Sequence, residues 1–465
     1  MIWLNIDKNK NIPLTKQIYK QIRDKILNGE LSVDTKLPSS RNLSEHLHIS
    51  RNVVLEAYHL LLLEGYIITK PSLGTFVAEV PRHTTYLQAP ASSLSTLDDS
   101  TSAKQVIDFR SGIPALDLLP NKKWHQLYAQ KLFNLPPSAM GYGLSQGTLE
   151  LRYAICDYLQ RTRGITCEPS QIIITNSSIQ SFSILSHVLL KENPCYIVED
   201  PLHNDIRQTF STVSNNYHIV PSDKQGILTS LLPQHITPAF IFVTPSHQYP
   251  LGGLLSAQRR IELIQYATEK NCYIIEDDYD SEFHYKTPPL STLYDLSPKH
   301  VIYIGTFSKV LCPTLRIGYM IVPLELTDKV CTYKKRCDFF THTISQLVLS
   351  DFINGKHLEK HINKMQKIYL KRRNTLINAL KQSFGDSVCI EGDATGLHLI
   401  ASFKNVIFTS ELIDFLYTKG IQIHPIWYHS KQQDYPKNSI ILGYSHLSPE
   451  TITAGIAILK EYLSH

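Results

Sequence analysis

The chain has 465 residues, 43% hydrophobic and 19% charged, which suits one small and one large globular domain. Its net charge of +5 is too weak to indicate nucleic-acid binding, so evidence for DNA binding has to come from local pattern. The N-terminus does not resemble a signal peptide and no stretch approaches ~20 apolar residues, so we expect a cytoplasmic protein rather than a secreted or membrane protein.

The cysteines argue against a disulfide framework and against a zinc site. There are 8 of them, they are scattered, and none forms a C-x-x-C pair. This usage is typical of reduced thiols in a cytosolic protein, and we expect no bound metal.

One segment separates two patterned regions of the chain. Residues 81–106 are rich in Ser, Thr, Ala and Asp and have no sustained apolar period, which indicates a flexible linker. It leaves an N-terminal head, residues 1–80, and a C-terminal body, residues 107–465.

The head is predicted to begin with three short helices. In the first, after Pro13, apolar residues recur in steps of four: Leu14, Ile18, Ile22 and Ile26. The second starts at Pro38-Ser39-Ser40, and the third, capped by Ser50, runs to about Glu64 before Gly65. Two β-like runs follow, so the head is predicted to be an α+β winged helix-turn-helix domain.

The start of the third helix suits contact with DNA. A recognition helix presents polar or basic residues to the major groove at its N-terminal end, and this one begins with Ser50, Arg51 and Asn52. Arginine can fork onto guanine, and asparagine can pair with adenine. Arg41 and the helix N-terminus can hold phosphates, and Gly74 in the wing would let the backbone approach the minor groove.

The helical pattern alone leaves a second interpretation open, a small protein-binding module with ordinary surface arginines. Residues 37–77, LPSSRNLSEHLHISRNVVLEAYHLLLLEGYIITKPSLGTFV, closely resemble the DNA-binding domain of the GntR family. That resemblance implies a double-stranded DNA operator as partner. One departure is Pro71-Ser72-Leu73-Gly74, where the family often has Gly-Ser-Gly.

The body alternates short apolar runs with helix-like segments. The runs are residues 172–175, 196–198, 239–243, 272–275 and 301–304. Continuous apolar strands with helices between them predict a mostly parallel sheet covered on both faces. Ligands of such sheets collect at the carboxyl ends of the strands, and polar clusters follow the predicted strand ends at Ile275 and Ile304.

These polar clusters suit pyridoxal 5′-phosphate. The cofactor needs a lysine for a Schiff base, a carboxylate for its pyridine nitrogen, and cationic and neutral donors for its phosphate. Lys309, Asp277 and Arg316 can fill these roles, Thr306 adds a hydroxyl, and Tyr279 can hydrogen-bond the ring hydroxyl.

Each of these residues has an ordinary alternative. A lysine after a strand is usually a solvated amine, and Arg316 can simply pair with an acid. The acids at 277, 278 and 280 suit Mg²⁺, although no phosphate-binding glycine loop accompanies them.

Several motifs of the body resemble fold-type I aminotransferases. They are Tyr142-Gly143-x-x-x-Gly147, Val198-Glu199-Asp200-Pro201, residues 243–250 (VTPSHQYP), residues 276–283 (EDDYDSEF) and residues 305–309 (GTFSK). More closely, the chain resembles the MocR family of bacterial regulators, which joins such a body to a GntR-type head. The resemblance implies an α/β, aspartate aminotransferase-like domain that binds pyridoxal phosphate, and a homodimer with heads swapped across.

The resemblance also implies residue roles. It places the cofactor lysine at Lys309, the pyridine-nitrogen acid at Asp277, the ring-hydroxyl tyrosine at Tyr279 and the phosphate arginine at Arg316. The phosphate cup falls at the helix start that contains Ser178 and Ile179, whose amides would face the anion.

Three departures from the family pattern are visible. The cup, residues 176–179, lacks its glycine, and His203 stands where a stacked tyrosine is usual. An imidazole can still stack on the ring. The last arginine is Arg373, so residues 439–444 lack the arginine that clamps a substrate carboxylate.

Three functions compete on this evidence. The chain can be a regulator controlled by pyridoxal phosphate, or by an amine or amino acid reacting with it, at Lys309. It can be a working aminotransferase with a DNA-binding head, or a regulator whose body is only a dimerisation scaffold. Lys309 with Asp277 argues against the scaffold, and the missing arginine argues against the enzyme. We therefore expect a regulator, with vitamin B6 status as one candidate signal, as in the PdxR-type members of the family.

Overall fold

The structure is a computed structural model that describes residues 4–80, 106–286 and 290–463. The chain divides into two compact units, Met1–Ser102 and Ala103–His465, which have separate hydrophobic cores. The predicted linker, residues 81–106, lies outside the described residues except for Val106. Among the helices that the structure describes, none combines the length and the hydrophobicity needed to cross a bilayer.

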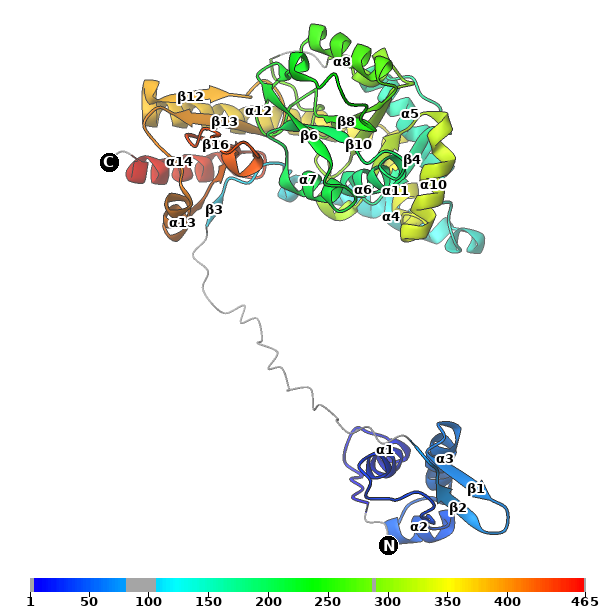
Figure 1. Cartoon of the computed structure of the whole chain (residues 1–465). Helices are drawn as coiled ribbons and strands as arrows, with labels where there is room; N and C mark the ends of the chain where they lie inside the picture. Colours follow the sequence, from blue (N-terminus) through cyan, green and yellow to red (C-terminus); the bar gives the residue numbers. More distant parts are fainter. Residues whose placement is uncertain (1–3, 81–105, 287–289, 464–465) are drawn as a thin grey trace. The chain divides into compact units, whose positions relative to one another are not determined.

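The first unit contains three helices followed by a hairpin (Figure 1). The elements are α1 (Leu14–Leu27), α2 (Ser40–Leu47), α3 (Arg51–Leu63), β1 (Ile67–Lys70) and β2 (Gly74–Val77). Ser39 and Ser50 cap α2 and α3 by accepting the N–H groups of Asn42 and Asn52. Apolar residues from all three helices and both strands form one core, including Ile18, Ile22, Leu43, Val54, Leu61, Ile67 and Val77. The predicted winged helix-turn-helix is confirmed.

The second unit is built on an eight-stranded sheet in the order β4-β11-β10-β9-β8-β5-β6-β7. The strands are β4 (Ile172–Thr175), β5 (Tyr196–Asp200), β6 (Tyr217–Asp223), β7 (Gly226–Ile227), β8 (Phe240–Val243), β9 (Tyr273–Asp278), β10 (Val301–Thr306) and β11 (Gly318–Ile321). The five strands from β10 to β6 run parallel, whereas β11 is antiparallel to both neighbours. The predicted mostly parallel sheet is confirmed.

Helices cover both faces of this sheet, because successive strand side chains point to opposite faces. Ile172 and Ile174 join one core cluster and Ile173 the other. The first cluster includes residues of α5 (Leu149–Arg163), α8 (Ala257–Glu269), α11 (Thr343–Asn354) and α12 (His357–Phe384). The second includes residues of α6 (Ser178–Leu189), α7 (Asn204–Ser211) and α10 (Leu324–Asp338), on the side of the sheet opposite α8 (Figure 1). Two further helices are α4 (Asn121–Asn134) and α9 (Leu293–Leu296).

A smaller antiparallel sheet follows, in the order β12-β13-β16-β15. Its strands are β12 (Val388–Glu391), β13 (His398–Phe403), β15 (His424–Pro425) and β16 (Ser439–Gly443), and its helices are α13 (Ser410–Thr418) and α14 (Pro449–Leu463). The first strand of the second unit, β3 (Ile107–Asp108), pairs in parallel with β14 (Ile421–Gln422), so the start of this unit lies beside its C-terminal part.

Two strands extend further than their apolar runs suggest. The strand ends predicted at Ile275 and Ile304 are wrong, because β9 continues to Asp278 and β10 to Thr306. Backbone pairing of Ile304 with Asp277 and of Gly305 with Asp278 overrides the polarity of these side chains. Asp277 and Asp278 therefore sit on a strand rather than on a loop, whereas Asp280 lies beyond its end.

Candidate functional site

The carboxyl ends of the central strands open into a cavity of about 280 Å³. All eight residues predicted to contact the cofactor line it: Ser178, Ile179, His203, Asp277, Tyr279, Thr306, Lys309 and Arg316. They come from five separate stretches of sequence, so the fold gathers them as the parallel-sheet interpretation requires.

Lys309 presents its amine to this cavity beside a glycine. Its Nζ donates a hydrogen bond to the carbonyl of Gly112 at 2.9 Å. Burial lowers the pKa of Lys309, although Asp280 and Asp277 oppose that shift electrostatically. Gly112 has φ +73°, and a Cβ there would lie 2.7 Å from Nζ. A lysine with a lowered pKa is a better nucleophile toward an aldehyde, and the glycine leaves it room.

Asp277 supplies a buried carboxylate without a full set of partners. It lies one residue before the end of β9, is 5% exposed, and its Oδ1 forms no hydrogen bond with any described residue. Burial, followed by the nearby Asp278 charge, raises the pKa of Asp277 well above its ordinary value. A cationic ring N–H entering the cavity would satisfy this oxygen and stabilise its charge.

Donors for an anion are found at the start of α6. Within the described residues, the N–H groups of Ser178 and Ile179 have no hydrogen-bond partner and the guanidinium of Arg316 has no ion pair. Thr306 adds a hydroxyl, which accepts the N–H of Ser308 at 3.2 Å. A helix N-terminus with a free arginine favours a phosphate.

A buried network holds this helix start in place. Asp338 at the end of α10 accepts hydrogen bonds from Asn176 at 2.7 Å and from Gln180 at 2.8 Å. Lys334, which is fully buried, donates to the same carboxylate at 2.9 Å. The loop before α6 is therefore fixed from outside the cavity.

A second glycine lets the sheet approach the same loop. Gly318 begins β11, and a Cβ there would lie 3.0 Å from the carbonyl carbon of Ser177 and 3.1 Å from the nitrogen of Ser178. The expected glycine is missing from residues 176–179, but this strand supplies one beneath them.

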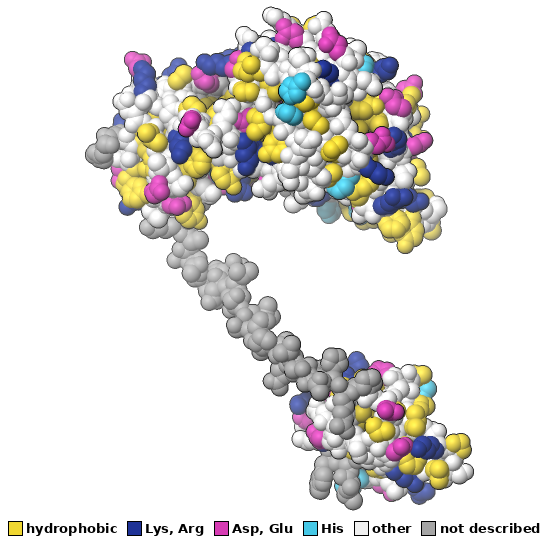
Figure 2. Space-filling model, viewed as in Figure 1, with side chains coloured by type: hydrophobic (Ala, Val, Ile, Leu, Met, Phe, Trp, Pro, Cys, Tyr) yellow, Lys and Arg dark blue, Asp and Glu magenta, His cyan; other side chains and the backbone are white. Residues whose placement is uncertain are grey.

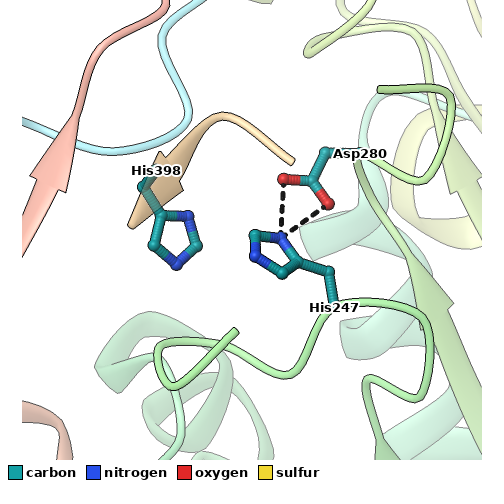
Figure 3. Close-up of side chains that lie close together, drawn as sticks. All are labelled: His247, Asp280 and His398. Atoms are coloured by element: carbon teal, nitrogen blue, oxygen red, sulfur yellow. Dashed lines mark hydrogen bonds and ion pairs between the residues drawn. The ribbon is translucent and has the colours of Figure 1, made fainter. Parts of the chain in front are cut away.

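Tyr279 is held by a neighbouring histidine. Its hydroxyl donates to the His247 carbonyl at 2.9 Å, and the His247 Nδ1 lies 3.0 Å from Asp280 (Figure 3). His398 faces the same imidazole, with ring centroids 4.6 Å apart. Donor atoms of His247, Asp280 and His398 lie within 4.8 Å of one another, the spacing of a candidate metal group. Asp280 already forms a hydrogen bond with His247, and His247 in turn accepts the Tyr279 hydroxyl. We therefore interpret these three side chains as a network that positions Tyr279 rather than as a metal site.

His203 lines the cavity and also begins α7. Its Nδ1 accepts the N–H of Asp205 at 3.2 Å, and its ring centroid lies 5.1 Å from that of Tyr249. Burial lowers the pKa of His203, and the charge of Lys309 adds to that shift. The imidazole is therefore neutral near pH 7.

The lining residues that sequence reasoning did not assign to the site include Ser111, Gly112, Tyr249 and His398. Tyr249 lies in the VTPSHQYP motif, which could have marked it. His398 begins a strand of the smaller sheet and carried no signal.

The residues predicted to read DNA are at the surface of the first unit. Ser50, Arg51 and Asn52 are exposed at the start of α3, and Arg51 donates from Nε to Ser40 Oγ at 3.3 Å. Arg41 is exposed and pairs with Glu45 at 3.2 Å. Figure 2 shows Lys and Arg side chains at the surface of this unit, interspersed with acidic and hydrophobic ones.

Two basic residues beside the wing, Lys36 before α2 and Lys70 at the end of β1, were not predicted. Gly74 has φ +117°, and a Cβ there would lie 3.1 Å from the Lys36 side chain. The Lys70 ammonium lies 4.8 Å from the ring centroid of Phe76 and pairs with Asp34. Lys36 and Lys70 therefore flank the hairpin, where they suit phosphate contacts.

Each of the two units matches the profile of a known protein family. The profile of class I and II aminotransferases matches residues 104–451, and that of the bacterial gntR regulatory proteins matches residues 14–77. The chain is 30% identical over 474 residues to the probable rhizopine catabolism regulatory protein MocR of Rhizobium meliloti, covering 98% of this chain and 95% of that one.

Two further relatives cover most of the chain. Identity to the pyridoxine biosynthesis transcriptional regulator PdxR of Corynebacterium glutamicum is 31% over 380 residues, which is 82% of this chain and 81% of that one. Among solved structures, the kynurenine aminotransferase of Pyrococcus horikoshii superposes with a TM-score of 0.72 at 25% identity, covering 78% of this chain and 91% of that one.

Proposed function

The chain belongs to the MocR-type family of GntR regulators, helix-turn-helix transcription regulators with an aminotransferase-like domain, and from this premise we propose that pyridoxal phosphate bound at Lys309 controls its binding to an operator. The observation that supports this proposal is one cavity that brings together the Lys309 amine, the Asp277 Oδ1 and the Arg316 guanidinium, the last two without a partner among the described residues. The amine suits the aldehyde of the cofactor, the carboxylate suits its pyridine nitrogen, and the guanidinium suits its phosphate.

The donor set fits the cofactor group by group. When bound, pyridoxal phosphate supplies an aldehyde that combines reversibly with amines. Lys309 offers the amine, Asp277 keeps the ring nitrogen charged, and Tyr279 faces the ring hydroxyl. Arg316 and Thr306 hold the phosphate together with the first amides of α6, those of Ser178 and Ile179. His203 flanks the ring as a neutral imidazole.

We propose that residues 1–80 bind DNA through α2, α3 and the wing, and that residues 107–465 form the effector domain. Arg51 and Asn52 read base edges in the major groove, and Ser50 and Arg41 fix the helix on phosphates. Gly74 brings the wing backbone to the minor groove. The protein acts in the cytoplasm, where its operator lies.

The working unit is proposed to be a homodimer. Side chains left exposed on the body include Phe133 at 91%, Tyr142 at 90% and Phe339 at 59%. Tyr142 and Phe339 lie 6.1 Å apart between ring centroids, and together with Phe340 they form an apolar patch. A patch of this kind is covered when a second copy packs on it. Two heads would then read two half-sites at a fixed spacing.

Control is proposed to be a shift between two populations of the dimer. The bound cofactor favours one arrangement of the heads because it binds that arrangement more tightly. Similarity to a pyridoxine biosynthesis regulator supports the cofactor itself as the signal and genes of vitamin B6 metabolism as targets.

The test compares Lys309→Ala with Lys329→Ala, which removes an exposed lysine that pairs with Glu192. An operator is first selected in vitro from random DNA duplexes. We expect the wild type and Lys329→Ala to gain the cofactor's visible absorbance and to change operator affinity when pyridoxal phosphate is added. Lys309→Ala should bind the operator but respond in neither way. An unchanged response of Lys309→Ala would refute the proposal.

A further inference from the structure

The cavity wall beyond the Lys309 amine consists of contacting imidazole and phenol rings. Tyr249 lies 5.1 Å from His203, 5.2 Å from His429 and 5.4 Å from His398 between ring centroids. Its hydroxyl is within hydrogen-bond distance of Ser111 Oγ, at 3.1 Å, and 3.5 Å from His429 Nε2. Of these rings, His203, Tyr249 and His398 line the cavity directly.

This wall contains no cation. Among the described residues that line the cavity, the lysine and arginine side chains are Lys309 and Arg316, and both are assigned to the cofactor. The two arginines of α12 are engaged elsewhere, Arg372 with the Ser445 carbonyl and Arg373 with Asp393. Among the described residues that line the cavity, no guanidinium besides that of Arg316 is present to hold a ligand carboxylate.

The layer behind the wall is apolar. Ile400, Ile426 and Ile441 form a separate buried cluster, and Tyr249 packs against it. A carboxylate placed against Tyr249 would therefore lose water without gaining a positive partner. At the rim, the exposed carboxylate of Asp205 repels a second negative charge further.

The rings are nevertheless well suited to hydroxyl groups. A neutral imidazole offers one donor and one acceptor, as a hydroxyl does. In His398 the Nε2–H donates to the Pro250 carbonyl at 3.0 Å, so its Nδ1 remains as an acceptor. Burial lowers the pKa of His398 far below its ordinary value and that of His429 to about 3, so both are neutral at physiological pH. His429 does not line the cavity and acts through Tyr249, whose hydroxyl lies 3.5 Å from its Nε2.

We propose that the cofactor-loaded cavity binds a primary amine that carries hydroxyl groups and no carboxylate, such as an amino alcohol or an amino sugar. The inference rests on the proposed function, because the cofactor's aldehyde is what makes the cavity selective for amines. Tyr249 is the specificity-determining residue, since its hydroxyl lies at the centre of the wall and its ring covers the apolar cluster.

The test uses two ligands that differ only in the disputed group. L-Serine and 2-amino-1,3-propanediol share an amine and a hydroxymethyl group, and the second replaces the carboxylate by another hydroxymethyl. Each is titrated into the loaded dimer, with the cofactor's absorbance and the thermal unfolding midpoint as readouts. We expect the diol to bind at least about tenfold more tightly, the factor produced by one or two hydrogen bonds. Equal or tighter binding of serine would overturn the inference.

Two variants test whether the preference for the diol over serine comes from Tyr249 in the cavity wall. Tyr249→Phe should weaken binding of the diol about tenfold and leave binding of serine unchanged. Tyr435→Phe is the matched control, because Tyr435 packs on the same apolar cluster without lining the cavity. Loss of diol binding in both variants would remove Tyr249 from its assigned role. Failure of the wild type to take up the cofactor would instead refute the proposed function.

Discussion

Replacing Gly112 by alanine tests the cavity most directly. Gly112 has φ +73°, and the added Cβ would lie 2.7 Å from Lys309 Nζ and 3.3 Å from Cε. Gly164 offers a matched control, because its φ is +71° and a Cβ there meets nothing within 4 Å. Both substitutions impose the same backbone strain, and only Gly112→Ala disturbs the lysine.

The expected magnitudes follow from these contacts. An alanine in the left-handed region costs about 1–2 kcal/mol, so both variants should lose that much free energy of unfolding. Ordinary contact needs ~3.5–4.0 Å, so Gly112→Ala must push Nζ away by about 1 Å. The bond from Nζ to the Gly112 carbonyl, worth about 0.5–1.5 kcal/mol, is weakened as well. We therefore expect cofactor affinity to fall about tenfold, or about 1.4 kcal/mol, in Gly112→Ala alone.

Two measurements separate strain from contact. Urea unfolding of the unloaded proteins gives the stability loss, and a titration with pyridoxal phosphate followed by absorbance gives the affinity. Similar unfolding midpoints show that both variants fold equally well. If Gly112→Ala then binds the cofactor as tightly as Gly164→Ala, the lysine does not react in the position that the structure gives it.

Three further predictions concern the head, the ring site and the aromatic wall. Arg51→Ala should weaken binding to the selected operator by about 1–3 kcal/mol with little effect on unrelated DNA, and no loss of specific affinity would make Arg51 a bystander. Asp277→Asn should bind pyridoxal phosphate at least about tenfold more weakly in equilibrium dialysis, because the charge that faces the ring nitrogen is gone; unchanged affinity would argue against that contact. Burial lowers the pKa of His429 to about 3. As the pH drops below about 6.5, His429 is protonated in the unfolded chain but stays neutral in the folded one. The free energy of unfolding therefore falls by up to about 1.4 kcal/mol per pH unit. Burial raises the pKa of Glu199 to about 8 and of Glu276 to about 7, and these acids act in the opposite sense over part of the same range. The measurement is therefore the stability difference between the wild type and His429→Gln. It should move about 2 kcal/mol in favour of the variant between pH 6.5 and 4.5, and a constant difference would contradict the shift.

The sequence was most informative where the chemistry lies next to a regular element. Asp277 and Lys309 follow apolar runs that form neighbouring parallel strands, so their convergence follows from sheet geometry alone. The start of α3 was equally accessible, because a serine cap and the residues after it are local features. Predicted and observed boundaries differ at β9 and β10, where ladder pairing extends a strand into polar residues.

Residues whose importance depends on distant contacts could not be found in the same way. Gly112 matters because a lysine 197 positions later lies against it. Asp338 holds Asn176 across 162 positions, and nothing in the sequence near either residue indicates that bond. His398 enters the cavity because a strand of the smaller sheet begins there. Such pairings are set by tertiary packing, which local propensity and periodicity do not contain.

The cup before α6 shows why a departure from a motif need not be a loss. The motif suggests a glycine within residues 176–179, where this chain has none. What an anion site of this kind requires is close approach of backbone atoms, and either partner in the contact can provide it. Here Gly318 on the neighbouring strand does so, since a Cβ there would lie 3.1 Å from the Ser178 nitrogen. The free amide of Ser178 is thus positioned by a glycine 140 residues away, which makes the missing glycine compatible with phosphate binding.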